Sequence, residues 1–142
     1  MSSDGDIRRI IKFFKGRDEV SALYIFGSFG KGRQKGESDI DIAVLVDESK
    51  PRKRSLDSLK KEYYSASAGF SLRPVDIVVL NAAPAFLKHR ILKTGKVLFD
   101  RNRKLRVRFT ANAIIEYLDY KPIEDICLKA VANRFRRAGI GR

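Results

Sequence analysis

The order of hydrophobic and polar residues predicts that the chain begins with a helix followed by two strands. Between Asp6 and Phe14 the apolar residues recur at helical spacing. The apolar and aromatic run at 22–26 ends at Gly27 and predicts a buried strand followed by a turn. A second strand is predicted at 39–46, where the alternation Asp-Ile-Asp-Ile becomes a continuous aliphatic run. Such a pattern is typical of a central strand with one end in contact with solvent.

The middle of the chain continues the α/β pattern. A helix is predicted from Leu56 to near Gly69, and a third strand at 75–80, directly after a proline. A further helix opens at Pro84 and closes at Gly95, before a short apolar stretch. Strands and helices therefore alternate, as in α/β domains.

The last third of the chain is predicted to be helical. We expect one helix over 103–120 and another over 123–138, with Pro122 separating them, because proline interrupts a helix interior. The sequence has no internal repeat and no long linker. Residues 1–142 are therefore predicted to form a single α/β domain.

Composition narrows the class of protein without choosing its partner. The chain has 142 residues, 30 Lys+Arg against 17 Asp+Glu and a net charge of +13. A charge of this size favours nucleic acid, nucleotide phosphates or an acidic protein surface. The longest aliphatic run, 42–46, is far shorter than a membrane span, and residues 1–9 do not resemble a signal peptide, so we expect a cytoplasmic protein. A single cysteine, Cys127, excludes an internal disulfide and a multi-cysteine zinc site.

The segment from Gly27 to Asp41 contains the candidate chemistry. Gly27 allows a tight turn after the first strand, and Ser28 can offer a hydroxyl and a main-chain N–H to a phosphate oxygen. Asp39 and Asp41 lie two positions apart in a strand, so both side chains leave the same face, with Cα atoms roughly 6.5 Å apart. Two such carboxylates repel each other unless a cation lies between them, and Mg²⁺ prefers oxygen ligands of this kind.

Asp76 is the third candidate carboxylate. It interrupts the apolar run at 75–80, where an acidic residue is costly to bury unless it is paired or binds a metal. Three carboxylates on adjacent strands could hold two Mg²⁺ ions, which is the arrangement that nucleotidyl transfer needs. The alternative for Asp76 is an ion pair with Arg73 at the strand end. A glycine-rich turn or an Asp-x-Asp pair alone is weak evidence, whereas the joint pattern is much stronger.

These residues resemble a known signature. Gly27-Ser28, then Gly32, then Ser38-Asp39-Ile40-Asp41 followed by aliphatic residues are similar to the motif of the nucleotidyltransferase superfamily that includes DNA polymerase beta. The short chain resembles the minimal nucleotidyltransferase (MNT) branch. Members of that branch serve as antitoxins of HEPN-domain ribonuclease toxins, and some transfer AMP from ATP to a toxin tyrosine.

The resemblance implies a fold and a set of site residues. The fold would be a small mixed sheet flanked by helices, and the substrates would be ATP and a HEPN toxin. Lys31 stands where many relatives have arginine, so a phosphate contact from that arginine passes to Lys31 or is lost. The implied nucleotide-binding residues are Gly27, Ser28, Lys31 and Ser38, and the implied catalytic residues and Mg²⁺ ligands are Asp39, Asp41 and Asp76.

Two other classes of function stay open from the sequence. One is a catalytically silent binding module that neutralises a partner by contact or binds RNA, and the other is a transferase acting on a small molecule such as an aminoglycoside. The segment 88–108 has nine basic residues and one acidic residue, for which we favour a solvated helix with a core stripe over a basic rim that steers an acidic partner or RNA. His89 is interpreted as a surface residue and Cys127 as a small core residue.

Overall fold

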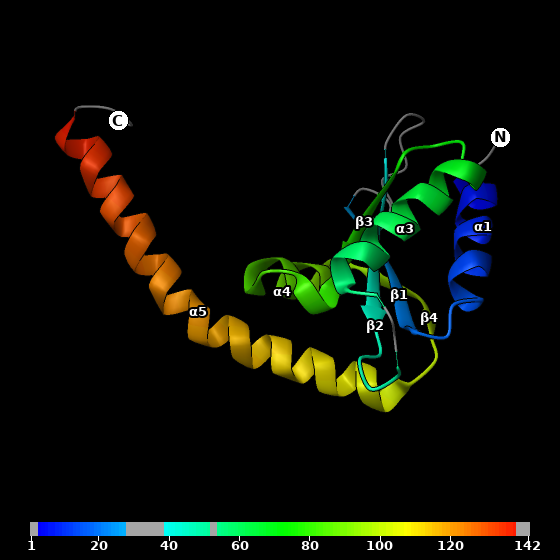
Figure 1. Cartoon of the computed structure of the whole chain (residues 1–142). Helices are drawn as coiled ribbons and strands as arrows, with labels where there is room; N and C mark the ends of the chain where they lie inside the picture. Colours follow the sequence, from blue (N-terminus) through cyan, green and yellow to red (C-terminus); the bar gives the residue numbers. More distant parts are fainter. Residues whose placement is uncertain (1–2, 28–38, 52–53, 139–142) are drawn as a thin grey trace.

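The computed structural model of the chain describes residues 3–27, 39–51 and 54–138. These residues form four strands and four α-helices, and the fourth strand lies at the short apolar stretch after Gly95, for which no strand was predicted (Figure 1). In chain order the elements are α1 (Ser3–Lys15), β1 (Val20–Phe26), β2 (Ile40–Val46), α3 (Leu56–Phe70), β3 (Val75–Val79), the short 3-10 helix η1 (Leu80–Ala82), α4 (Ala85–Thr94), β4 (Lys96–Asp100) and α5 (Arg103–Arg137). The third strand ends one residue earlier than expected, because Leu80 begins η1.

The strands form one mixed sheet in the order β3-β2-β1-β4. β1 is antiparallel to both of its neighbours, while β2 and β3 are parallel and are connected through α3. The mixed sheet flanked by helices is therefore confirmed. The register places Asp41 of β2 between Phe26 of β1 and Asp76 of β3.

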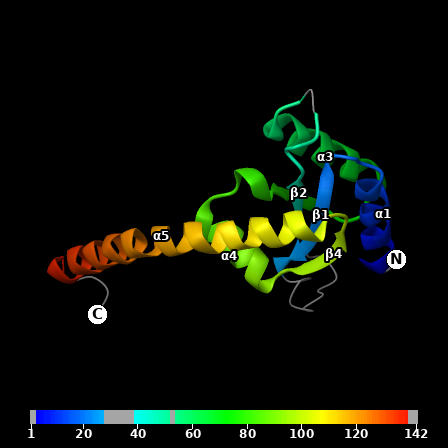
Figure 2. The ribbon, with the colours of Figure 1, turned by 90° about the horizontal axis from the view of Figure 1, so that it is seen from below.

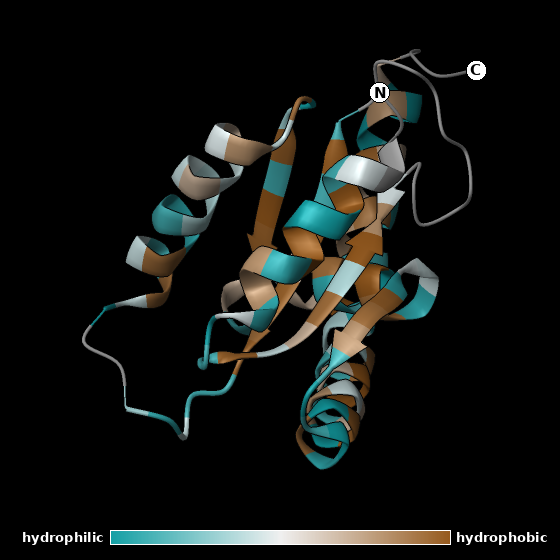
Figure 3. Cartoon of the chain, turned by 90° about the vertical axis from the view of Figure 1, so that its right-hand side faces the viewer, coloured by the Kyte–Doolittle hydropathy of each residue, from teal (hydrophilic) through white to brown (hydrophobic). Residues whose placement is uncertain are grey.

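The core has two layers, one on each face of the sheet, and Figure 3 shows the hydrophobic residues gathered along the strands. α1 and α3 cover one face, where Ile10, Phe14 and Tyr63 are fully buried. α4 and α5 cover the other face, against Ala43 and Leu45 of β2. Because side chains alternate along a strand, Asp41 shares the α4 and α5 face with Ala43 and Leu45.

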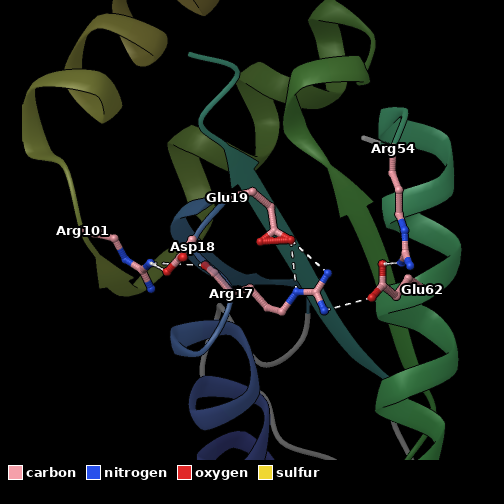
Figure 4. Close-up of polar contacts among 6 residues, drawn as sticks. All are labelled: Arg17, Asp18, Glu19, Arg54, Glu62 and Arg101. Atoms are coloured by element: carbon pink, nitrogen blue, oxygen red, sulfur yellow. Dashed lines mark hydrogen bonds and ion pairs between the residues drawn. The ribbon is translucent and has the colours of Figure 1, made fainter. Parts of the chain in front are cut away.

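Ion pairs connect the turn between α1 and β1 to two other parts of the fold (Figure 4). The Arg17 guanidinium contacts the carboxylates of Glu62 in α3, at 2.9 Å, and Glu19, at 3.0 Å. Burial alone would lower the pKa of Arg17, but these two acidic partners outweigh burial and raise it. Arg101, just before α5, lies 3.9 Å from Asp18. This cluster lies at the start of β1, the strand end away from Phe26 and Asp41, so it has a structural role.

The C-terminal third of the chain corrects two expectations. The two helices expected at 103–120 and 123–138 are one helix, α5, with Pro122 inside it. A proline removes one backbone hydrogen bond and crowds the preceding turn, yet several helical turns on either side of Pro122 maintain the helix, which bends along its length in Figure 1. Figure 2 shows its far half extending away from the sheet. Cys127 lies in that half and is exposed, so it is not a core residue.

In the described part of the chain, no helix is both long enough and apolar enough to cross a bilayer.

Candidate active site

Three aspartates meet where β2 and β3 begin. Asp39 directly precedes β2 and is exposed, Asp41 is the second residue of β2 and is partly buried, and Asp76 is the second residue of β3 and is exposed. Asp41 and Asp76 are register partners, and Asp39, one residue before β2, is near enough for its charge to act on Asp41. The structure therefore places Asp41 beside Asp76 and near enough to Asp39 for both charges to act on it. The parallel pairing of β3 with β2 positions Asp76 next to Asp41. Its side chain is exposed, not buried as its hydrophobic neighbours suggested.

The electrostatics of Asp41 reflect this crowding. Its pKa is raised, first by burial and then by the negative charges of Asp76 and Asp39. The ion pairs found among the described residues include neither Asp41 nor Asp76. The repulsion among the three aspartates is the kind that a divalent cation relieves.

The chemistry of the donor set fits Mg²⁺, which binds carboxylate oxygens in preference to nitrogen or sulfur. Among the described residues, no group of three or more acidic, histidine or cysteine side chains lies close enough together, as placed, to hold a metal ion. Asp39, Asp41 and Asp76 are the residues that would hold the ion.

Gly27 directly follows β1, lies beside Asp41 and has a backbone conformation that favours glycine. Its φ is +67°, in the left-handed region. A Cβ atom at Gly27 would overlap Oδ2 of Asp41 and lie 3.2 Å from its Cγ. The missing side chain thus makes room for the Asp41 carboxylate, and the turn predicted at Gly27 has a direct consequence for the acidic cluster.

A small pocket of about 160 Å³ opens beside Gly27 and Asp41. Its other lining residues are Phe26, Leu87, Arg90 and Thr94. Arg90 and Thr94 come from the last turns of α4, which follows β3 by only a few residues. Sequence reasoning missed Arg90, since one arginine among nine basic residues carries no signal of its own. The available clue was the place of its helix in the chain, between β3 and β4, the strand that pairs with β1.

The remaining sequence-predicted nucleotide-binding residues, Ser28, Lys31 and Ser38, lie outside the described residues.

The basic segment 88–108 contributes to packing between α4, β4 and α5. Lys88 contacts Glu116 at 3.1 Å and lies over the ring of Phe109. His89 is half-buried and stacks on Tyr117, with ring centroids 3.9 Å apart, so it is not the fully surface-exposed residue that its charged neighbours suggested. These contacts attach α5 to α4, and so to the helix that lines the pocket.

The comparisons with known proteins identify the family. The family model described as "Polymerase beta, Nucleotidyltransferase" matches residues 8–104, more than half of the chain. The chain therefore belongs to the polymerase beta nucleotidyltransferase family, and the predicted enzyme class is confirmed.

Within that family the chain is an MntA-like member of the MNT branch. It is 26% identical over 130 residues to the protein adenylyltransferase MntA of Aphanizomenon flos-aquae, covering 85% of this chain and 84% of the relative. It is 31% identical over 93 residues to the protein of the same name from Shewanella oneidensis, covering 64% of this chain and 63% of the relative.

Solved structures show the same fold. The crystal structure of a toxin–antitoxin with AMP-PNP matches with a TM-score of 0.73 at 24% identity, covering 92% of this chain and 99% of that chain. A complex of a tri-AMPylated Shewanella oneidensis HEPN toxin with its MNT antitoxin matches with a TM-score of 0.70 at 24% identity, covering 89% of this chain and 96% of that chain.

Proposed function

We propose that this protein transfers AMP from ATP to a tyrosine hydroxyl of a partner HEPN toxin in the cytoplasm, and so acts as its antitoxin. The observation that carries the proposal is the position of Asp41 beside Asp76 and Gly27, with Asp39 close by; burial and then the charges of Asp76 and Asp39 raise the pKa of Asp41. The relatives named protein adenylyltransferase support the choice of AMP as the transferred group.

In this reaction a new bond forms between the acceptor oxygen and the α-phosphorus of ATP, the α–β phosphoanhydride bond breaks, and pyrophosphate leaves. Mg²⁺, when bound, neutralises phosphate charge and makes the attacking hydroxyl more acidic. Asp39 and Asp41 would hold the cation. Because Gly27 has no Cβ, there is room for the Asp41 carboxylate. Asp76 lies on the far side of Asp41 from Gly27, where its carboxylate can help bind the cation and receive the proton of an approaching hydroxyl.

A protein acceptor is supported by the free half of α5, residues 121–137. Helical spacing puts Ile123, Ile126, Cys127, Ala130 and Val131 on one stripe, and Ile123 and Ile126 are 61% and 68% exposed. An exposed apolar stripe of this kind marks an interaction surface.

The charge and position of α5 favour the acceptor itself as the occupant of this stripe. Residues 121–137 carry five basic and two acidic side chains, which suits an apolar groove with acidic groups at its rim. The first half of the same helix packs on α4, which lines the pocket beside Asp41. A partner bound to α5 would therefore be held near the candidate active site. A small-molecule acceptor would leave this surface without a role.

The experiment is to incubate the protein with labelled ATP, Mg²⁺ and the HEPN protein encoded beside it, and to follow AMP on the partner. Wild type should label the partner, and Asp41→Asn should not. Asp57→Asn is the matched control, because Asp57 is an exposed carboxylate on α3 away from the site and should label normally.

The outcome also separates the alternatives. If the partner is neutralised equally by wild type and Asp41→Asn, with no AMP on it, the protein acts by binding and the proposed transfer is refuted. Labelling of an aminoglycoside in place of the partner would refute the protein acceptor.

A further inference from the structure

We infer that Arg90 binds the β- and γ-phosphates of the nucleotide, a role that rests on the proposed function and extends it to a residue outside the acidic cluster. Arg90 and Asp41 line the same pocket of about 160 Å³, from α4 and β2 respectively. A guanidinium and a carboxylate thus border one small space next to the Gly27 turn.

The two charges do not neutralise each other. Among the described residues, no ion pair joins Arg90 to a carboxylate. The Arg90 guanidinium is therefore available to an anionic ligand. Opposite charges on two walls of one pocket suit a metal-bound phosphate, with the cation on the aspartates and phosphate oxygens on the arginine, which can bind them in bidentate fashion.

The sheet order decides which part of the nucleotide Arg90 would meet. β2 lies between β1 and β3, so Gly27 and Asp76 flank Asp41 on opposite sides. Arg90 shares its pocket with Phe26 and Gly27 of the β1 side. If the acceptor approaches on the Asp76 side, the leaving pyrophosphate departs on the Gly27 side, where Arg90 lies.

The end of α4 is fixed firmly enough to position this side chain. Ile91 is fully buried, and the hydroxyl of Thr94 donates a hydrogen bond to the Arg90 carbonyl at 2.7 Å. A Cβ at Gly95 would lie 2.7 Å from the Ile91 carbonyl oxygen and 3.2 Å from that of Ile25, so glycine lets the end of α4 approach β1 closely. The C-terminal end of α4 is therefore held against β1, while Arg90, directly before the buried Ile91, stays exposed.

The test measures nucleotide binding without transfer. Isothermal titration calorimetry with Mg²⁺ and α,β-methylene-ATP, which cannot release pyrophosphate, should show that Arg90→Gln binds about 10- to 100-fold more weakly than wild type, the loss typical of a charge-assisted contact. AMP has no β- or γ-phosphate, so its affinity should be unchanged. Arg90→Lys should fall between, because a lysine keeps the charge but loses the bidentate geometry.

Lys93→Gln is the matched control, since Lys93 is exposed on the same helix and does not line the pocket. An equal loss for Lys93→Gln would show a general charge effect and overturn the inference. If Arg90→Gln binds the analogue as tightly as wild type while wild type still labels its partner, Arg90 has no such role and the proposed function stands. If wild type binds neither nucleotide, both fail. Thermal unfolding of each variant verifies that it is folded.

Discussion

Replacing Gly27 with alanine tests how closely the turn after β1 and the acidic cluster depend on each other. Gly27 has a φ of +67°, and an added Cβ would overlap Oδ2 of Asp41. Alanine at this position therefore introduces two separate penalties, backbone strain and displacement of a carboxylate.

The size of each penalty follows from the structure. A left-handed conformation costs a residue with a Cβ about 1–2 kcal/mol, which lowers the melting temperature of a domain of this size by about 2–8 °C. The overlap is relieved only if the Asp41 carboxylate turns away from Gly27. A displacement of about 1 Å of a group that positions reactants lowers activity about 100-fold. We expect Gly27→Ala to be moderately destabilised and almost inactive.

The measurements are thermal unfolding and the rate of AMP transfer to the partner. Gly69→Ala is the control, because a Cβ at Gly69 meets no atom within 4 Å and alanine is favoured in a helix. In an Asp41→Ala background the overlap is absent, so Gly27→Ala should cost only the strain. Wild-type activity and stability in Gly27→Ala would refute the reasoning.

Three further predictions concern the acidic cluster, the core and α5. Burial and then the charges of Asp76 and Asp39 raise the pKa of Asp41, so its ionisation destabilises the metal-free fold as pH rises above the ordinary aspartate value of 3.8; at pH 7 Asp41→Asn should therefore be more stable than wild type without metal, and Mg²⁺ should raise the melting temperature of wild type only; an equal Mg²⁺ effect on both proteins would contradict this. Burial opposes ionisation of Asp6, but hydrogen bonds from the Leu72 N–H, at 3.1 Å, and from Arg9 outweigh burial and lower its pKa, so its contribution to stability is present above pH 3.8 and is lost as pH falls through the lower folded value. Asp6→Ala should therefore cost about 1–3 kcal/mol in urea unfolding at pH 7 and little at low pH, and a cost independent of pH would count against the assignment. Ile126→Asp should weaken partner binding at least about 30-fold and leave nucleotide binding intact, whereas Ala132→Asp, on the opposite face of α5, should bind the partner normally; equal effects of the two would remove the stripe as the docking surface.

The sequence was sufficient for much of the fold and for the acidic pair, because both follow from local periodicity. Asp39 and Asp41 share a face as soon as 39–46 is a strand. The position of Asp76 was only conditional, since nothing local specifies that β3 pairs with β2 in parallel and in register with Asp41. The hydrophobic neighbours of Asp76 suggested that it is buried, yet its side chain is exposed at the start of the strand.

The features that the sequence did not predict all depend on tertiary contacts. Pro122 and the apolar residues around Cys127 predicted a break and a packed helix, but the far half of α5 is continuous and extends away from the sheet, so its apolar side chains are exposed. Arg90 could not be identified because its significance depends on α4 reaching the end of β1 across the sheet. Contacts between segments distant in sequence decide these features.

The most direct test of the account is Mn²⁺ binding, measured by electron paramagnetic resonance, in wild type and in the single variants Asp39→Asn, Asp41→Asn and Asp76→Asn, with α,β-methylene-ATP present. We predict that wild type binds the ion and that each variant binds it much more weakly, with Asp57→Asn like wild type. Undiminished Mn²⁺ binding in all three variants would contradict the claim that these carboxylates form one metal site.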